Sequence, residues 1–317
     1  MKYSLLSRFR GALLGSFVGE SLVCVGYQNR LWGGVSFTSP KPEEAQTNQT
    51  LSDWSQLATC GTESLIRCGK VNLEDWWLLF EKTPSSVSFK SAGTSSEAAV
   101  ATLPIALFFH EDEVKLRQQL LACADVLQHK SEAPEAISVV AYAIALALTE
   151  KLDVATLIPQ TLDYLGTSQI PLKRQLEQVQ MLLEQGAGLD TTLTHLRRDA
   201  QKSRGEPLGR SHIAIALAFY CFLATPEDFR LSVSRAARSQ YQPQITAALT
   251  GALAGVYNSI IGIPVGWRLA ANRISSGIQR LQLADRLFEV WAGVYDVPPF
   301  AQGQLLTVAA PRVIQPR

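Results

Sequence analysis

One apolar stretch in the last third of the chain restricts the fold more than any other segment. Between Ile245 and Ile263 every residue is apolar, small, or an uncharged hydroxyl or amide. Asn258 and Pro264 disfavour the alternative of a membrane span, so we interpret the stretch as the buried central helix of a soluble domain. One side of that helix is nearly bare backbone and permits close approach of a neighbour, because small residues recur at intervals of four or five: Thr246, Gly251, Gly255 and Ser259.

The N-terminal segment carries a matching pattern. Residues 4–23 predict a helix in which Gly11, Gly15 and Gly19 recur every four residues. Each glycine costs about 1 kcal/mol relative to alanine in a helix interior, so three on one face indicate a geometric requirement. We therefore expect this helix to pack against the glycine face of the central helix.

The remaining chain also favours helices. Of the 317 residues, 47% are hydrophobic and only 18% are charged, which is typical of a large buried core. Neither a hairpin dipeptide nor a sustained alternation of apolar and polar residues occurs. We predict an all-α fold with one helical domain over residues 1–297, whose last helix runs from about Ala271 to Tyr295, and a proline-containing tail over residues 298–317. A further helix is expected to begin at Thr225-Pro226.

The charge balance and the cysteines limit the possible partners and compartments. The 29 basic residues nearly cancel the 28 acidic ones, so neither a nucleic acid nor a membrane surface is an expected partner. The five cysteines form no CxxC pair, which indicates free thiols in a reducing compartment. Glu20 interrupts the apolar run of the N-terminal segment, so that run is a poor export signal and we expect a cytoplasmic protein.

Three polar segments converge if the first, second and central helices pack together. The first is Glu20, near the end of the first helix. The second is Ser52-Asp53-Trp54-Ser55, at the start of a helix that stops at Gly69. The third is Gln242-Pro243-Gln244, where the free N–H groups at the start of the central helix would face a ligand or a metal centre.

These segments resemble motifs of the ADP-ribosylglycohydrolase family. Residues 10–20, Arg-Gly-Ala-Leu-Leu-Gly-Ser-Phe-Val-Gly-Glu, are similar to its RxxGxLxGxxxGDA opening. Residues 52–56 stand where the family has Thr-Asp-Asp-Thr-Gln, and residues 242–257 are similar to its Asp-x-Asp-Thr-x-Ala-Ala-x-x-Gly-x-Leu-x-Gly-x-Tyr run. The Ile-Pro-x-x-Trp ending recurs at residues 263–267. This resemblance implies an all-helical fold with two divalent ions, usually magnesium, at the base of a cleft for ADP-ribose.

The ligand positions of this family are largely replaced in this chain. Ser52 keeps a hydroxyl and Asp53 keeps a carboxylate, while Glu20 replaces an aspartate with an acid that is one methylene longer. The other positions lose the oxygen ligand or the anion contact that the family shows. Trp54, Gln242 and Gln244 replace aspartates, Ile245 and Gln128 replace threonines, and Ala101 replaces an arginine.

Two divalent ions carry four positive charges and need several anionic oxygens. The resemblance therefore predicts a degenerate member with no metal, no cofactor and no hydrolase activity, which acts as a binding, regulatory or assembly protein. Its expected partners are ADP-ribose or a related nucleotide, or another protein. Glu20 and Asp53 are vestigial catalytic candidates, and the predicted ligand contacts are Ser52, Trp54, Ser55, His129, Gln242 and Gln244.

Other roles remain open for these residues. A remodelled hydrolase could use Glu20 and Asp53 as a carboxylate pair on an ADP-ribosyl N- or O-glycosidic bond. In purely structural roles, Ser52 caps a helix, Glu20 pairs with an arginine, the two glutamines close the vacated hollow by hydrogen bonding, and His129 ends a helix.

Overall fold

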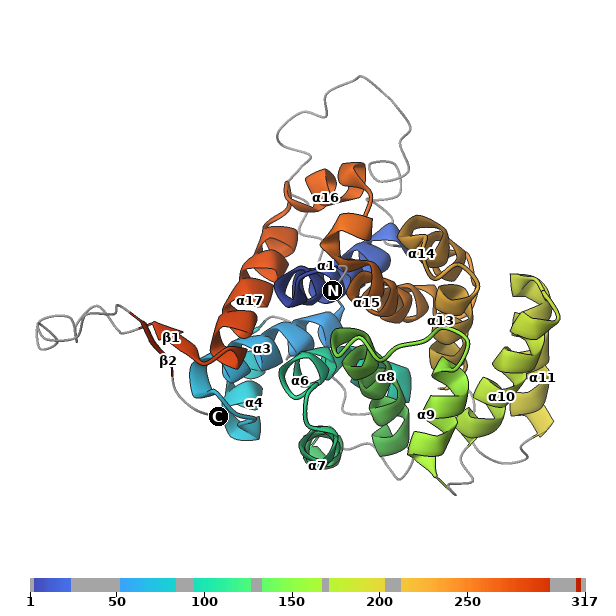
Figure 1. Cartoon of the computed structure of the whole chain (residues 1–317), viewed down its shortest axis with the longest axis horizontal. Coiled ribbons are helices and arrows are strands. Elements are labelled where there is room, and N and C mark those ends of the chain that lie inside the picture. Colours follow the sequence, from blue (N-terminus) through green and yellow to red (C-terminus); the bar gives the residue numbers. More distant parts are fainter. Residues whose placement is uncertain are drawn as a thin grey trace, which may run out of the picture.

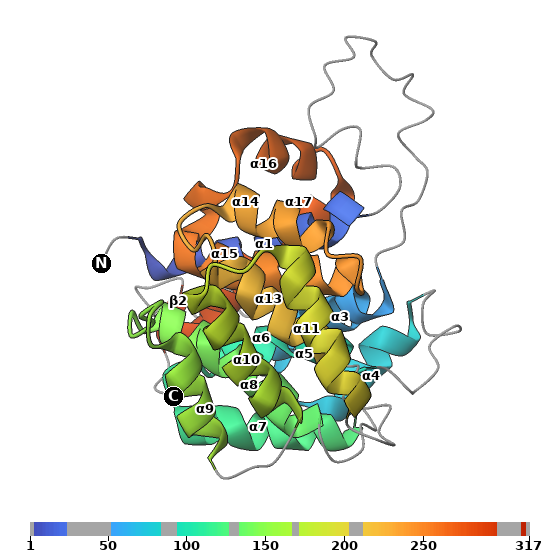
Figure 2. The ribbon, with the colours of Figure 1, turned by 90° about the vertical axis from the view of Figure 1, so that its right-hand side faces the viewer.

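The chain is organised around a central pair of helices that other helices surround (Figures 1 and 2). A computed structural model describes residues 3–23, 52–83, 94–126, 133–166, 171–202, 212–296 and 312–314. The predicted all-α class is confirmed. The helices are α1 (Leu5–Val23), α3 (Asp53–Cys68), α4 (Leu73–Glu81), α5 (Ser95–Ala101), α6 (Leu103–Phe108), α7 (Glu113–Val126), α8 (Ala133–Leu148), α9 (Leu157–Leu165), α10 (Pro171–Glu184), α11 (Leu189–Lys202), α13 (Ile213–Leu223), α14 (Phe229–Ala237), α15 (Pro243–Gly262), α16 (Val265–Ala271) and α17 (Ser275–Trp291), and the strands are β1 (Val294–Asp296) and β2 (Arg312–Ile314).

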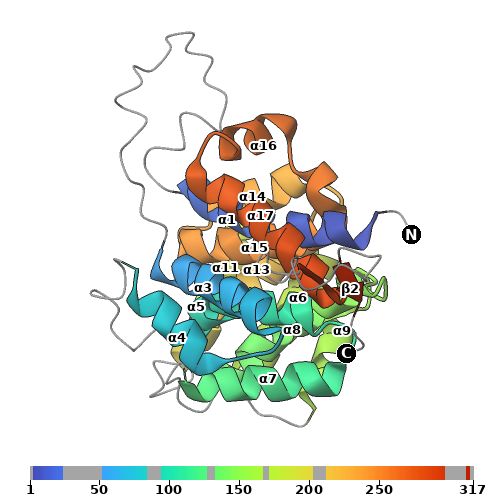
Figure 3. The ribbon, with the colours of Figure 1, turned by 90° about the vertical axis from the view of Figure 1, so that its left-hand side faces the viewer.

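Helices α1 and α15 form the most extensive helix contact among the described elements, and they lie side by side in Figures 1 and 3. Their glycines meet in antiparallel order, with Gly11 against Gly255 and Gly15 against Gly251. A Cβ atom at any of these four positions would overlap a carbonyl group of the opposite helix. The predicted packing of the two glycine faces is therefore confirmed.

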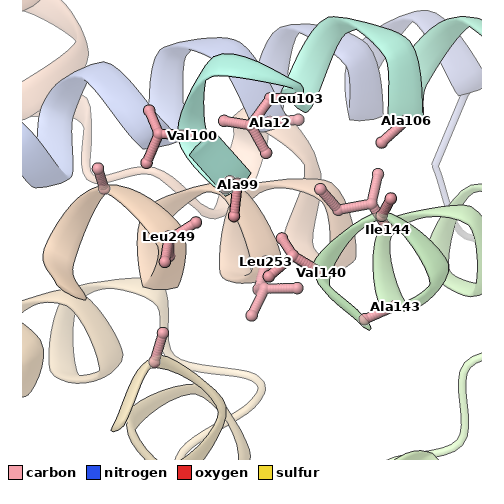
Figure 4. Close-up of a cluster of buried hydrophobic side chains, with 14 of the residues drawn as sticks. Ala12, Ala99, Val100, Leu103, Ala106, Val140, Ala143, Ile144, Leu249 and Leu253 are labelled. Carbon is pink, nitrogen blue, oxygen red and sulfur yellow. The ribbon is translucent and has the colours of Figure 1, made fainter. Parts of the chain in front are cut away.

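A large hydrophobic core surrounds this pair. Side chains from α5, α6 and α8 meet those of α15 in the close-up of Figure 4. Leu253 of α15 lies near Val140 of α8, and both side chains are buried. Among the described helices, α15 alone is long and apolar enough to cross a membrane, but 72% of its most apolar window is buried inside the protein. Its burial in this core accounts for its apolar composition.

The structure corrects several predicted boundaries. The helix predicted to begin at Thr225 begins at Phe229, where Asp228 caps α14 by accepting a hydrogen bond from the N–H of Leu231. The last helix starts at Ser275, and not at about Ala271, because α16 is a separate helix before it. It ends at Trp291. Val294–Asp296 then pairs antiparallel with Arg312–Ile314. The division of the chain into a domain and a tail near residue 297 stays a prediction.

The described cysteines are free thiols: Cys60, Cys123 and Cys221 are buried, and Cys68 is half-buried. Burial raises the pKa of Cys123 to about 12 and that of Cys221 to about 12. Such thiols are almost fully protonated at neutral pH and are poor nucleophiles or metal ligands. Cys24 lies outside the described residues.

His212 makes stability depend on pH. It is the N-cap residue of α13, and burial lowers its pKa to about 4. An unfolded chain would protonate this histidine near pH 6.5 while the folded chain keeps it neutral, so protonation favours unfolding as the pH falls from 6.5 towards 4. We expect its contribution to reduce the free energy of unfolding by about 2 kcal/mol between pH 7 and pH 5. Urea denaturation of the wild type and of His212→Gln at both pH values measures this contribution. An equal loss in the variant would contradict this prediction.

Candidate functional site

The candidate site begins at the C-terminal end of α1, where Glu20 is only 3% exposed. The preceding residue, Gly19, contacts the backbone of Ala247 in the first turns of α15. The glycine contact between the two helices therefore fixes the backbone that carries Glu20 relative to the start of α15.

The Glu20 carboxylate accepts two hydrogen bonds from the start of α3. Its Oε1 accepts from the backbone N–H of Ser52 at 2.9 Å, and its Oε2 accepts from the hydroxyl of Ser55. Ser52 is also the N-cap of α3, because its Oγ accepts from the N–H of Ser55 at 3.4 Å. A carboxylate at this place is favoured by the partial positive charge of a helix N-terminus.

A buried arginine completes this cluster. Arg280 of α17 is 5% exposed, and its Nη2 donates to the backbone oxygen of Ser55 at 2.6 Å. Desolvation lowers the pKa of Arg280, while the negative charge of Glu20 is the largest influence that raises it. Arg280 thus supplies positive charge next to the acid and hydroxyls of the predicted site. We call Glu20, Ser52, Ser55 and Arg280 the acid–arginine cluster.

Sequence reasoning missed Arg280, although its position carried a usable signal. The buried stripe of α17 includes Gly277, Ala284 and Leu287, and Arg280 occupies the same stripe. An arginine at helical spacing among residues that face the core is unusual unless it has a charged or carbonyl partner. Glu20 was expected to pair with an arginine, but the sequence does not identify which arginine.

The other half of the predicted site lies at the start of α15. Gln242 is its N-cap, with a left-handed backbone (φ 40°, ψ 53°), and its Oε1 accepts from the hydroxyl of Ser96 at 3.2 Å. Ser96 belongs to α5, which packs against both α3 and α15. The Gln244 side chain is exposed. The structure thus places Gln242 against α5 and leaves Gln244 at the surface.

The remaining predicted contacts have different positions. Trp54 is 8% exposed and belongs to the hydrophobic core. Asp53 is half-buried in the first turn of α3. His129 and Gln128 lie outside the described residues. Within the described ranges, no group of three or more His, Cys, Asp and Glu side chains is arranged to hold a metal ion.

A separate cavity of about 270 Å³ lies near the opposite end of α1, lined by Tyr3, Arg8, Ala147, Glu150, Leu152, Tyr257 and Asn258. Arg8 donates to the backbone oxygen of Ala147 and, at 2.8 Å, to the Glu150 carboxylate. Twelve residues separate Arg8 from Glu20, which is about 18 Å along a helix axis. This cavity is therefore not part of the acid–arginine cluster.

Comparison with known proteins identifies relatives of the whole domain. A family profile described as ADP-ribosylglycohydrolase matches residues 1–296. One solved structure, titled "ADP-ribosylglycohydrolase-related protein complex", is similar with a TM-score of 0.62 and 20% sequence identity, and the alignment covers 90% of this chain and 99% of that one. At this identity the structural likeness shows the fold alone. The search of curated proteins gave no match.

Proposed function

The chain belongs to the ADP-ribosylglycohydrolase family, and we propose that it is a member without the paired metal ions and without hydrolase activity, which acts as a binding, regulatory or assembly protein. The observation that carries this proposal is the acid–arginine cluster. In it, hydrogen-bond donors from the protein itself occupy both oxygens of Glu20, and Arg280 is the nearby cation.

The donor set does not fit two divalent ions. Magnesium requires nearly octahedral oxygen ligation at about 2.0–2.1 Å, and it sheds its water reluctantly. Glu20 already accepts hydrogen bonds from Ser52 and Ser55 on its two oxygens, and a metal bound to it would have to approach the positive charge of Arg280. Two further positions, Gln242 and Gln244, offer neutral amides in place of carboxylates. These features support a site in which the polar groups of Glu20 are satisfied without metal.

The alternative function, a remodelled hydrolase, would use Glu20 and Asp53 to cleave ADP-ribosyl N- or O-glycosidic bonds. A general acid or base must reach the proton that it transfers. Glu20 is buried, and both its oxygens already accept hydrogen bonds. This arrangement favours a structural role for Glu20 over a catalytic one, and the alternative serves as an outcome of the test below.

Hydrolase activity is the direct test of this proposal. We expect the purified full-length protein to release no ADP-ribose from ADP-ribosylated arginine, ADP-ribosylated serine or O-acetyl-ADP-ribose, with or without millimolar magnesium. Magnesium-dependent release would overturn the proposal. Release without magnesium that is abolished in Asp53→Ala would instead establish the remodelled hydrolase. An active magnesium-dependent family member, assayed in parallel, controls for substrate quality.

Calorimetry with ADP-ribose then separates the two forms of the proposal. Heat of binding that does not change when magnesium is added supports a protein that recognises ADP-ribose or a related nucleotide. The absence of binding under both conditions supports a role through protein contacts alone. We also propose a cytoplasmic location, since buried free thiols are typical of a reducing compartment.

A further inference from the structure

One surface of the molecule combines exposed aliphatic side chains with arginines. We call it the α16 face and define it by Ile261, Val265 and Leu269 together with Arg268 and Arg273. The three aliphatic side chains are 64%, 60% and 55% exposed in that order. Helix α16 lies at the outer end of the molecule in all three ribbon views (Figures 1, 2 and 3).

The packing of α16 explains why this face points outward. Trp267 and Ala271 are buried, and the Trp267 ring lies 6.2 Å from that of Phe229 in α14, measured between centroids. Val265 and Leu269 have the same four-residue spacing but occupy the other side of the helix, so the core contact of Trp267 leaves them exposed. Leu231 of α14 and Ile278 of α17 are also exposed.

The charged residues of this face, as defined, are both arginines. From Phe229 to Ala284 the chain contains six arginines and no aspartate, glutamate or lysine, and Asp228 and Asp285 border this stretch. Within the described part of the chain, the Arg268 side chain makes no hydrogen bond or ion pair, and its buried Nε has no partner. Arg273 is exposed. A guanidinium without a carboxylate partner, next to exposed aliphatic groups, is complementary to an acidic and apolar ligand.

We propose that the α16 face is a docking site for an acidic amphipathic helix of a partner protein. The aliphatic row would contact the apolar side of that helix, and the arginines would bind its carboxylates. This proposal rests on the assignment of the protein as a binding or assembly protein, and it names the surface and the kind of partner.

Two other occupants fit this face less well. A second copy in a two-fold interface would bring the arginines of this face from both copies together. An anionic membrane is typically recruited by clusters of about four to eight basic residues or by a long amphipathic helix with aromatic groups facing the lipid. Helix α16 has 7 residues, and its aromatic residue, Trp267, faces the core.

Binding of a synthetic helix tests the proposal. The probe is a fluorescein-labelled peptide with leucine every three or four residues and glutamate elsewhere, and the same peptide with lysine in place of glutamate is its charge control. We expect the glutamate peptide to bind the full-length protein, more weakly at high salt. The double variant Val265→Asp/Leu269→Asp should weaken the binding measured by anisotropy by about tenfold or more.

The matched control is Val114→Asp/Met181→Asp, which changes two exposed aliphatic residues on α7 and α10 and should bind as the wild type does. Equal affinity of the wild type and the α16-face variant, or equal binding of the lysine peptide, would overturn the proposal. Sedimentation of the wild type as a dimer, or with vesicles of phosphatidylcholine and phosphatidylserine, would also overturn it if the α16-face variant loses that property. The hydrolase assay on the wild type is independent of this result, so failure of either proposal can be recognised separately.

Discussion

Replacing Gly15 by alanine is expected to destabilise the protein by at least about 3 kcal/mol, and to prevent folding if the total stability is modest. The added methyl group would overlap the carbonyl oxygen of Gly251 and would also lie 3.1 Å from the Phe229 ring. Neither helix can move away easily, because the same close contact is repeated at Gly11 and Gly255. Urea denaturation followed by circular dichroism measures the change in the free energy of unfolding.

Gly266 provides the matched control for this substitution. It also lies within a helix, α16, but an added Cβ would have no heavy atom within 4 Å. Gly266→Ala should therefore be neutral, or stabilise by up to about 1 kcal/mol through helix propensity. Equal effects of the two substitutions would show that the α1–α15 contact is looser than its geometry indicates.

The central fold was predictable because its cause is local in the sequence. Small residues at a spacing of four create a helix face that only another backbone can fill, and the two segments with this pattern were visible without a structure. The start of α3, where Ser52 caps the helix with its side chain, was also readable. The α16 helix was not predicted, because the expected last helix began only at about Ala271, whereas Pro264 precedes the first turn of a separate short helix.

The candidate site was only partly predictable, because its partners come from distant segments. The expected packing of the first, second and central helices placed Glu20 near residues 52–55, and the structure brings Glu20 together with Ser52 and Ser55. Pattern alone did not reveal that Arg280 of the last helix reaches the backbone of Ser55. An arginine on a buried stripe indicates that a partner exists, but the partner's identity depends on how the helices pack.

Arg280 and Glu20 bear directly on the proposal that this site is stable without metal. A buried carboxylate is costly to desolvate unless charge and hydrogen bonds compensate it. Here the start of α3 supplies the hydrogen bonds, and Arg280 supplies the charge. If the two side chains compensate each other, removing one should be more harmful than removing both.

A double-mutant cycle measures this coupling. Arg280→Met should destabilise the protein by about 3–5 kcal/mol, because it leaves Glu20 buried without a cation. Glu20→Gln keeps the shape of the side chain but leaves Arg280 without its acid. We expect the double variant Glu20→Gln/Arg280→Met to be more stable than the sum of the single effects predicts, by at least about 2 kcal/mol. Chemical denaturation of all four proteins at pH 7 gives the coupling energy.

The Arg67–Asp75 ion pair is the natural reference for this cycle. The Arg67 side chain is 55% exposed, so solvent screens the pair, and its coupling should be no more than about 1 kcal/mol. Additive effects of Glu20→Gln and Arg280→Met would show that the two groups stabilise the fold separately. In that case Glu63, whose charge also acts on Arg280, would be the acid that compensates the arginine, and Glu63→Gln in the Arg280→Met background would then restore stability. Strong coupling to Glu20 would mean that the protein itself provides the cation beside this acid.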